Sequence, residues 1–120
     1  MGHKMKKINS YQSGLFSELL ARIYLRFHGF CILKSRYITG KNTGRAEIDI
    51  IARRANLIIF VEVKKRQNIA FAFDAIPPKQ IIRLRGAAES YLAKKRWLGD
   101  ARFDVITVCG LNINWFKGAI

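Results

Sequence analysis

Apolar residues recur at helical spacing near the start of the chain. Ser13 is the expected N-cap of this first helix and Gly29 its C-terminal stop. On the polar side of the helix, Glu18 precedes Arg22 by four residues, a spacing typical of a surface ion pair. The apolar stripe of the predicted amphipathic helix follows the spacing i, i+3, i+4, i+7, i+8 and i+11: Phe16, Leu19, Leu20, Ile23, Tyr24 and Phe27.

Strand-like segments follow this helix. A short strand is expected from residue 31 to residue 37 or 38, and a loop of turn-forming residues over 39–44. Two runs that alternate with a period of two come next, Ala46–Arg53 and Leu57–Lys65. Because the connection between them at 54–56 is short, the two runs are predicted to form an antiparallel hairpin.

The rest of the chain contains a second helix and two further strands. Pro77 and Pro78 suit the first turn of a helix that runs to about Trp97. One strand is expected over 102–108, and a last short strand over 111–116. The predicted order is α, β, β, β, α, β, β, which indicates an α/β fold with a mixed sheet of about four or five strands flanked by helices.

Composition narrows the range of partners. The 120 residues fit one domain, 1–120, of which 1–12 form a basic N-terminal segment that we expect to be disordered. The chain has 22 Lys and Arg against 8 Asp and Glu, a net charge of +14, yet it is 50% hydrophobic and should therefore fold. So basic a surface favours nucleic acid as a partner, although a merely basic protein would have the same composition.

Several other classes of protein are excluded by the sequence. The central apolar run Leu57 to Val61 ends at Glu62, far short of the roughly 20 residues that span a membrane. The N-terminus lacks the apolar core of a signal peptide, so a cytoplasmic location is expected. Cys31 and Cys109 stand singly, which argues against a disulfide framework or a zinc site.

Three of the eight acids lie within the predicted hairpin. Alternation groups Glu47 and Asp49 on one face of the first strand, opposite Ala46, Ile48, Ile50 and Ala52. On the second strand, it groups Glu62 with Lys64. A two-residue turn at 55–56 would place Asp49 directly opposite Glu62, with Cβ atoms about 5 Å apart.

Two facing carboxylates within apolar strands need a compensating cation. A divalent metal is an economical one, since Mg²⁺ is typically held by one or two protein carboxylates. The alternative is a structural role, in which Glu62 and Lys64 mark the solvated end of a strand and Asp49 pairs with Arg53 or Arg66.

These residues resemble a known family. The segments Ala46–Ile51 (AEIDII), Phe60–Arg66 (FVEVKKR) and Arg102–Val105 (RFDV) resemble the YraN-type family of uncharacterised bacterial proteins, and the match runs from Gly14 to Lys117. That family is similar to the PD-(D/E)XK nuclease superfamily, whose restriction-endonuclease-like core also occurs in archaeal Holliday-junction resolvases.

The resemblance implies roles for five residues. Asp49 matches the motif aspartate, Glu62 and Lys64 match Glu-x-Lys, Glu18 matches the helix-borne acid, and Gln80 matches a polar residue near the start of the following helix. All five are expected to be catalytic, with Mg²⁺ or Mn²⁺ held by Asp49, Glu62 and Glu18. The chain departs from the pattern at two neighbouring positions, where Ile48 replaces a common proline and Ala46 replaces a common glycine.

The expected function is hydrolysis of phosphodiester bonds in DNA, which is favoured over RNA as the substrate. Recognition of branched or broken DNA is expected as well. A homodimer is compatible with this function. The alternatives are a non-catalytic nucleic-acid-binding module and a protein-interaction subunit. The aromatic residues that could anchor such a subunit could equally be core residues: Phe71, Phe73, Trp97 and Trp115. The residues expected to contact the phosphate backbone are Lys41, Arg45, Arg53, Arg54, Lys65, Arg66, Lys79, Arg83 and Arg85.

Overall fold

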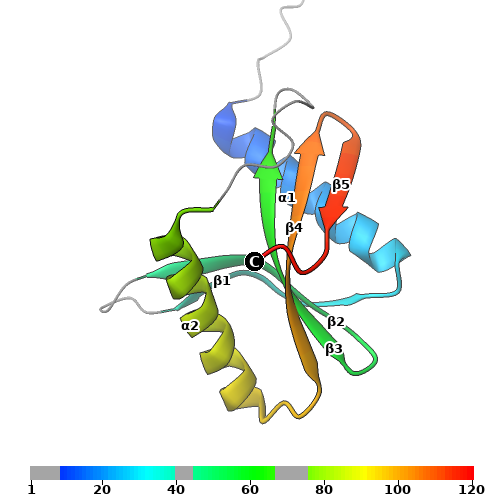
Figure 1. Ribbon diagram of the computed structural model, residues 1–120. Helices are drawn as coiled ribbons and strands as arrows, with labels where there is room; N and C mark the ends of the chain where they lie inside the picture. Colours follow the sequence, from blue (N-terminus) through cyan, green and yellow to red (C-terminus); the bar gives the residue numbers. More distant parts are fainter. Residues whose placement is uncertain (1–8, 40–44, 67–75) are drawn as a thin grey trace, which may run out of the picture.

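The computed structural model describes residues 9–39, 45–66 and 76–120, and these form a mixed α/β structure (Figure 1). The order α, β, β, β, α, β, β confirms the predicted fold class. Neither helix in these ranges is long and apolar enough to cross a membrane. The elements are α1 (Ser10–Phe27), β1 (Cys31–Thr39), β2 (Ala46–Arg54), β3 (Leu57–Lys65), α2 (Pro78–Lys95), β4 (Asp100–Cys109) and β5 (Asn112–Phe116).

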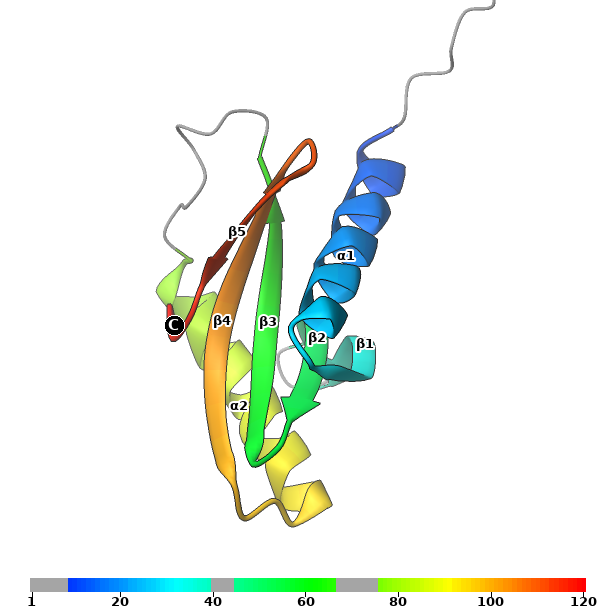
Figure 2. The same ribbon diagram turned by 90° about the vertical axis from the view of Figure 1, so that its right-hand side faces the viewer.

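The described strands form one five-stranded sheet in the order β1-β2-β3-β4-β5. All neighbouring strands are antiparallel except β3 and β4, which run parallel and are separated in sequence by α2. The two helices lie on opposite sides of the sheet (Figure 2). Ile59 and Val61 of β3 pack on the α1 side, whereas Ile58 and Phe60 pack on the α2 side, so the central strand is buried on both faces.

Helix α1 begins three residues earlier than the predicted cap at Ser13. Asn9 is the N-cap, and its side chain accepts a hydrogen bond of 2.8 Å from the backbone N–H of Gln12. The Gln12 side chain accepts one of 3.3 Å from the backbone N–H of Asn9 in return. This capping box satisfies two N–H groups at the helix start at once, which explains why the helix begins at Ser10.

The orientation of α1 also differs from the prediction. The residues facing the sheet include Ser17, Glu18 and Ala21, while most of the predicted apolar stripe faces solvent. The small side chains at positions 17 and 21 let the helix approach the sheet closely, and Glu18 finds a partner there. The exposed members of the stripe are Phe16, Leu19, Ile23 and Phe27, with exposed fractions of 47%, 41%, 39% and 86%.

The alternation of β2 is interrupted near Asp49. Ile50 and Ala52 pack on the α1 side as expected, but Ala46 and Ile48 pack with Ile51 on the α2 side, so the predicted grouping of all four residues was wrong. Pairing between β2 and β3 ends at Ile50 and Val61, and the first part of β2 extends away from β3 beside β1 (Figure 1). The strand therefore changes faces at the point where it leaves its neighbour.

Asp104 ties the C-terminal end of the chain to β4. Its side chain is fully buried and accepts two hydrogen bonds from Arg102, of 2.7 and 2.8 Å. It also accepts hydrogen bonds of 2.9 Å from the Trp115 indole and from the backbone N–H of Gly118. A buried carboxylate bonded in this way holds β5 and the residues after it against the sheet.

We predict that Asp104→Ala lowers the free energy of unfolding by about 3 kcal/mol, because the N–H groups of Trp115 and Gly118 lose their acceptor and Arg102 loses its counter-charge. Urea denaturation measures the change. Asp100→Ala, which removes an exposed acid at the start of the same strand, is the control and should stay within about 0.5 kcal/mol of the wild type. Equal stabilities of the two variants would contradict this role of Asp104.

Candidate active site

The β2–β3 hairpin brings Asp49 and Glu62 together. Its turn contains two residues, Ala55 and Asn56, and the strands pair from Arg54–Leu57 to Ile50–Val61 in the predicted register. Asp49 and Glu62 occupy the next position of that register, just beyond the last paired residues, and each carboxyl group shifts the pKa of the other. Asp49 Oδ2 also accepts a hydrogen bond of 2.8 Å from the backbone N–H of Val63.

The surroundings of this carboxyl pair favour a proton on it. The pKa of Glu62 is raised to about 9, chiefly by burial and then by the neighbouring Asp49 carboxyl group and its charge, against the lowering effect of Lys64. Burial also raises the pKa of Asp49, although the Glu62 carboxyl group and the hydrogen bond from Val63 oppose the rise. At neutral pH, the pair therefore retains a proton unless a cation replaces it.

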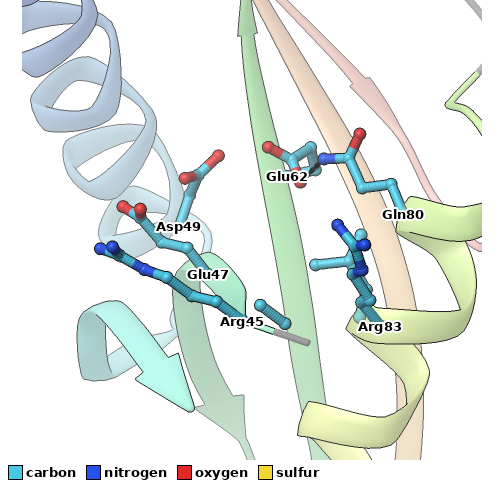
Figure 3. A pocket seen from close by; sticks show the side chains of 8 residues that line it. Arg45, Glu47, Asp49, Glu62, Gln80 and Arg83 are labelled. Atoms are coloured by element: carbon cyan, nitrogen blue, oxygen red, sulfur yellow. Dashed lines mark hydrogen bonds between the residues drawn. The ribbon is translucent and has the colours of Figure 1, made fainter. Parts of the chain in front are cut away.

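The pair lies in a pocket of about 360 Å³ between the start of β2 and the start of α2 (Figure 3). Gln80, on the first turn of α2, places its Nε2 3.5 Å from Glu62 Oε2. Arg45 and Arg83 approach from opposite sides, Arg45 beside Glu47 and Arg83 beside Gln80 (Figure 3). A negatively charged ligand in this pocket would meet two arginines next to the acids.

Glu47 belongs to the pocket although the resemblance assigned it no role. It lines the pocket beside Asp49, and its charge raises the pKa of both Asp49 and Glu62. Its position two residues before Asp49 was a usable signal, because alternation placed both acids on one face. The structure thus gathers three acids of the hairpin around one pocket.

Glu18 lies near this group but is held by another residue. Its two carboxylate oxygens each accept a hydrogen bond of 3.0 Å from Arg36 of β1. The predicted surface ion pair of Glu18 with Arg22 was therefore wrong. Arg36 lies opposite Asp49 in the β1–β2 register and has a left-handed φ of 52°. The Glu18 charge still raises the pKa of Asp49, which shows that the acid of α1 acts on the hairpin acids.

The donor set suits a small hard cation with few protein ligands. Among the described residues, no three His, Cys, Asp or Glu side chains form a group ready to hold a metal ion. Asp49 and Glu62 offer two carboxyl groups from facing strands, and one or two carboxylates are what Mg²⁺ typically takes from a protein. Because the pKa values of both acids are raised, the pair holds a proton at neutral pH. A cation bound between the two carboxyl groups would displace that proton.

The structure distributes the predicted phosphate-binding residues that it describes over four places. Arg45 and Arg83 line the acidic pocket, and exposed Lys79 lies one residue before Gln80 on α2. Lys65 and Arg66, at the end of β3, line a second hollow with Ser17 of α1.

The remaining predicted residues lie elsewhere. Arg53 stacks on Trp97 at 4.6 Å, and Arg54 on Phe30 at the same distance, both near the β2–β3 turn. Arg85 lines a hollow on α2 with Phe103.

Three residues named from the sequence, Lys41, Phe71 and Phe73, lie outside the described part of the chain. Trp97 and Trp115 are both partly buried and pack against the two core clusters, Trp97 on the α2 side and Trp115 on the α1 side. These two tryptophans therefore contribute to the core.

A mixed five-stranded sheet with two carboxyl groups meeting in a basic-rimmed pocket defines an α/β protein with a candidate acidic active site. The chain belongs to the family described as Uncharacterised protein family UPF0102, whose model matches residues 17–108. It is 41% identical to a UPF0102 protein of Shewanella denitrificans over 110 residues, covering 88% of this chain and 96% of the relative. It is 37% identical to a UPF0102 protein of Bartonella tribocorum over 107 residues, covering 88% and 79%.

We predict that Glu62→Gln flattens the pH dependence of stability. Between the ordinary pKa of 4.5 and the folded value of about 9, the folded wild type binds more protons than the unfolded chain. Its free energy of unfolding must therefore fall as the pH rises through that range, whereas an amide does not titrate. The wild type should lose about 1 to 3 kcal/mol relative to the variant, because one pKa unit corresponds to about 1.4 kcal/mol.

Urea denaturation in metal-free buffer at several pH values checks this expectation. Glu89→Gln, which alters an exposed acid of α2, is the matched control and should keep the wild-type slope. If Glu62→Gln also kept that slope, Glu62 would not carry the retained proton.

Proposed function

We propose that this protein is a metal-dependent nuclease that hydrolyses phosphodiester bonds, with DNA as its substrate. The observation that carries the proposal is the pair of facing acids Asp49 and Glu62, half-buried in a pocket that also presents Arg45 and Arg83. The chain has only 8 acids against 22 basic residues, yet three of the acids lie at one pocket. Repulsion between their charges destabilises the folded chain, so a functional role explains this cluster better than a structural role does. The resemblance to PD-(D/E)XK nucleases points to the same residues.

Asp49 and Glu62 are the proposed ligands of Mg²⁺ or Mn²⁺. Such an ion, when bound, supplies Lewis-acid polarisation of a phosphate and lowers the pKa of water. Glu47 adds negative charge beside the pair and so strengthens the attraction for a cation. Glu18 has a different proposed role, since its two bonds to Arg36 fix α1 against β1 behind the site.

The chain's own residues would bind and orient the substrate. Arg83 and Arg45 neutralise phosphate charge on either side of the acids, and Gln80 holds the Glu62 carboxyl group in position. Lys64, which shares the polar end of β3 with Glu62, places a positive charge where it can stabilise the negative transition state or hold the attacking water.

Recognition would depend on the shape of the nucleic acid. Arginine and lysine contacts to phosphates position a duplex without reading its sequence. The pocket is small, and its rim carries two arginines from different parts of the chain, Arg45 just before β2 and Arg83 on α2. We therefore propose a preference for branched or broken DNA, in which the backbone is accessible from more than one direction.

One observation favours a second candidate, a nucleic-acid-binding module without catalysis. Glu18 is bound to Arg36, so only two of the three metal ligands expected from the sequence face each other. Such a module would bind DNA equally well with or without a divalent metal, and it would keep its affinity in Asp49→Asn.

We predict Mg²⁺- or Mn²⁺-dependent cleavage of labelled DNA that stops on addition of a chelator. Glu62→Ala and Asp49→Asn should each lower the rate by at least about 100-fold, since each removes a charged metal ligand. Linear duplex, single-stranded DNA, four-way junctions and RNA are compared side by side. Glu89→Ala, purified identically, controls for contaminating nucleases; identical behaviour of wild type and Glu62→Ala on every substrate would refute the proposal.

We predict that Arg83→Ala weakens DNA binding and reduces its salt dependence. Loss of one phosphate contact should lower the slope of log K against log salt by about 1. Fluorescence anisotropy at several salt concentrations measures both effects. Arg85→Ala is the matched control, because Arg85 lies on the same helix but lines a different hollow. Equal effects of the two substitutions would mean that only net charge matters, and not the pocket.

A further inference from the structure

A second hollow lies at the end of β3, on the α1 side of the sheet. It has a volume of about 400 Å³, which is within the range of small-ligand sites in proteins. The start of α1, the end of β3 and the β4–β5 turn surround it, and all three lie at one end of the molecule (Figure 2). We call it the β3-end hollow, and its lining includes Ser13, Phe16, Ser17, Lys65, Arg66 and Leu111.

The charge of the β3-end hollow suits a phosphate group. Lys65 is exposed, and Arg66 next to it donates a hydrogen bond of 3.0 Å from Nη1 to the Lys65 carbonyl oxygen, which restrains the guanidinium group. Of the described residues that line the hollow, two are basic and none is acidic. An anion in this place would therefore meet two cations without a competing carboxylate.

Two exposed apolar side chains border the same hollow. Phe16 of α1 is 47% exposed, and Leu111 of the β4–β5 turn is 78% exposed. Ser17, one residue after Phe16, is small and buried, and its hydroxyl group donates a hydrogen bond of 3.0 Å to the Ser13 carbonyl oxygen, so it leaves room beside the ring. Exposed aromatic rings beside basic residues are the surface on which unpaired bases stack.

The combination of these side chains chooses the ligand. A phosphate alone would not use Phe16 and Leu111, and an apolar ligand would not use Lys65 and Arg66. A nucleotide has both an anionic phosphate and a base with a flat face. In a duplex, both faces of a base are covered by its neighbours, so only an unpaired nucleotide can offer the face and the phosphate together.

The β3-end hollow and the acidic pocket share the end of β3. Glu62 lines the pocket, whereas Lys65, three residues later, lines the hollow. Three residues of a strand span about 10 Å, and an odd separation places their side chains on opposite faces of the sheet. A nucleic-acid strand bound at the pocket could therefore continue past the end of β3 into the hollow.

We propose that the β3-end hollow binds one unpaired nucleotide of a DNA strand, with Lys65 and Arg66 on its phosphate and with Phe16 and Leu111 against its base. The inference rests on the proposed function for the identity of the ligand and deepens it, because broken and branched DNA contain unpaired nucleotides more often than an intact duplex does. Every base has a face that can stack, so no sequence preference is expected.

Fluorescence anisotropy of the full chain tests the proposal with two labelled probes, an oligodeoxythymidylate and an abasic strand of equal length, in the presence of a chelator that prevents cleavage. Phe16→Ala should weaken binding of the oligodeoxythymidylate at least about fivefold and leave binding of the abasic strand unchanged. Phe27→Ala is the matched control, because Phe27 is 86% exposed on the same helix but does not line the hollow. It should bind both probes like the wild type.

The phosphate contact is tested by Lys65→Gln. This variant should bind both probes more weakly and should lower the slope of log K against log salt by about 0.7, the value for one contact to a single strand. Lys94→Gln removes the same charge from an exposed position of α2 and should keep the wild-type slope. Equal slopes for the two variants would overturn the phosphate contact.

A tryptophan at position 16 reports stacking directly. After subtraction of the wild-type signal, the fluorescence of Phe16→Trp should be quenched by the oligodeoxythymidylate, whereas that of Phe27→Trp should not. Circular dichroism confirms that the variants fold, as expected for exposed positions.

Two outcomes would overturn the proposal: Phe16→Ala that binds both probes like Phe27→Ala, or a wild type that binds the abasic strand as tightly as the oligodeoxythymidylate. Neither outcome bears on the nuclease activity, which is measured with Mg²⁺ and Asp49→Asn. Conversely, a wild type that cleaves no substrate but binds the oligodeoxythymidylate through Phe16 and Lys65 would refute the nuclease and support the hollow as a nucleotide site.

Discussion

The parallel pairing of β3 with β4 is the constraint on which the rest of the molecule depends. It runs without a break from Leu57 opposite Asp100 to Lys65 opposite Val108. Parallel neighbours cannot be joined by a tight turn, so the chain must cross from the end of β3 back to the start of β4, and α2 lies within that crossover. The crossing lays α2 on one face of the sheet and so places Gln80 and Arg83 next to Glu62.

The acidic pair exists at the expense of stability. Asp49 and Glu62 lie where β2 separates from β3, and both pKa values are raised chiefly because burial disfavours their charges. A buried acid with a complete set of donors looks different: Asp104 accepts four hydrogen bonds from Arg102, Trp115 and Gly118. The contrast separates an acid that supports the fold from a pair whose charges are disfavoured by burial, as they would be at a binding site for a cation.

Helix α1 is joined to the sheet by a buried acid. Its inner side carries Glu18, whose two bonds to Arg36 fix the helix to β1. The Glu18 charge also raises the pKa of Asp49, so the packing of this helix influences the acidic pair.

Local patterns in the sequence determined the order of the elements, the two-residue turn at Ala55 and Asn56, and the register that brings Asp49 to Glu62, because all three depend on short-range geometry. Only the tertiary structure decided which side of α1 faces the sheet, since helical spacing identifies apolar positions but not the surface that will bury them. It likewise decided that β2 changes faces near Asp49, that Glu18 binds Arg36, and that Glu47 joins the pocket. These outcomes depend on contacts between segments far apart in the chain, and such contacts leave no periodic signal in either segment.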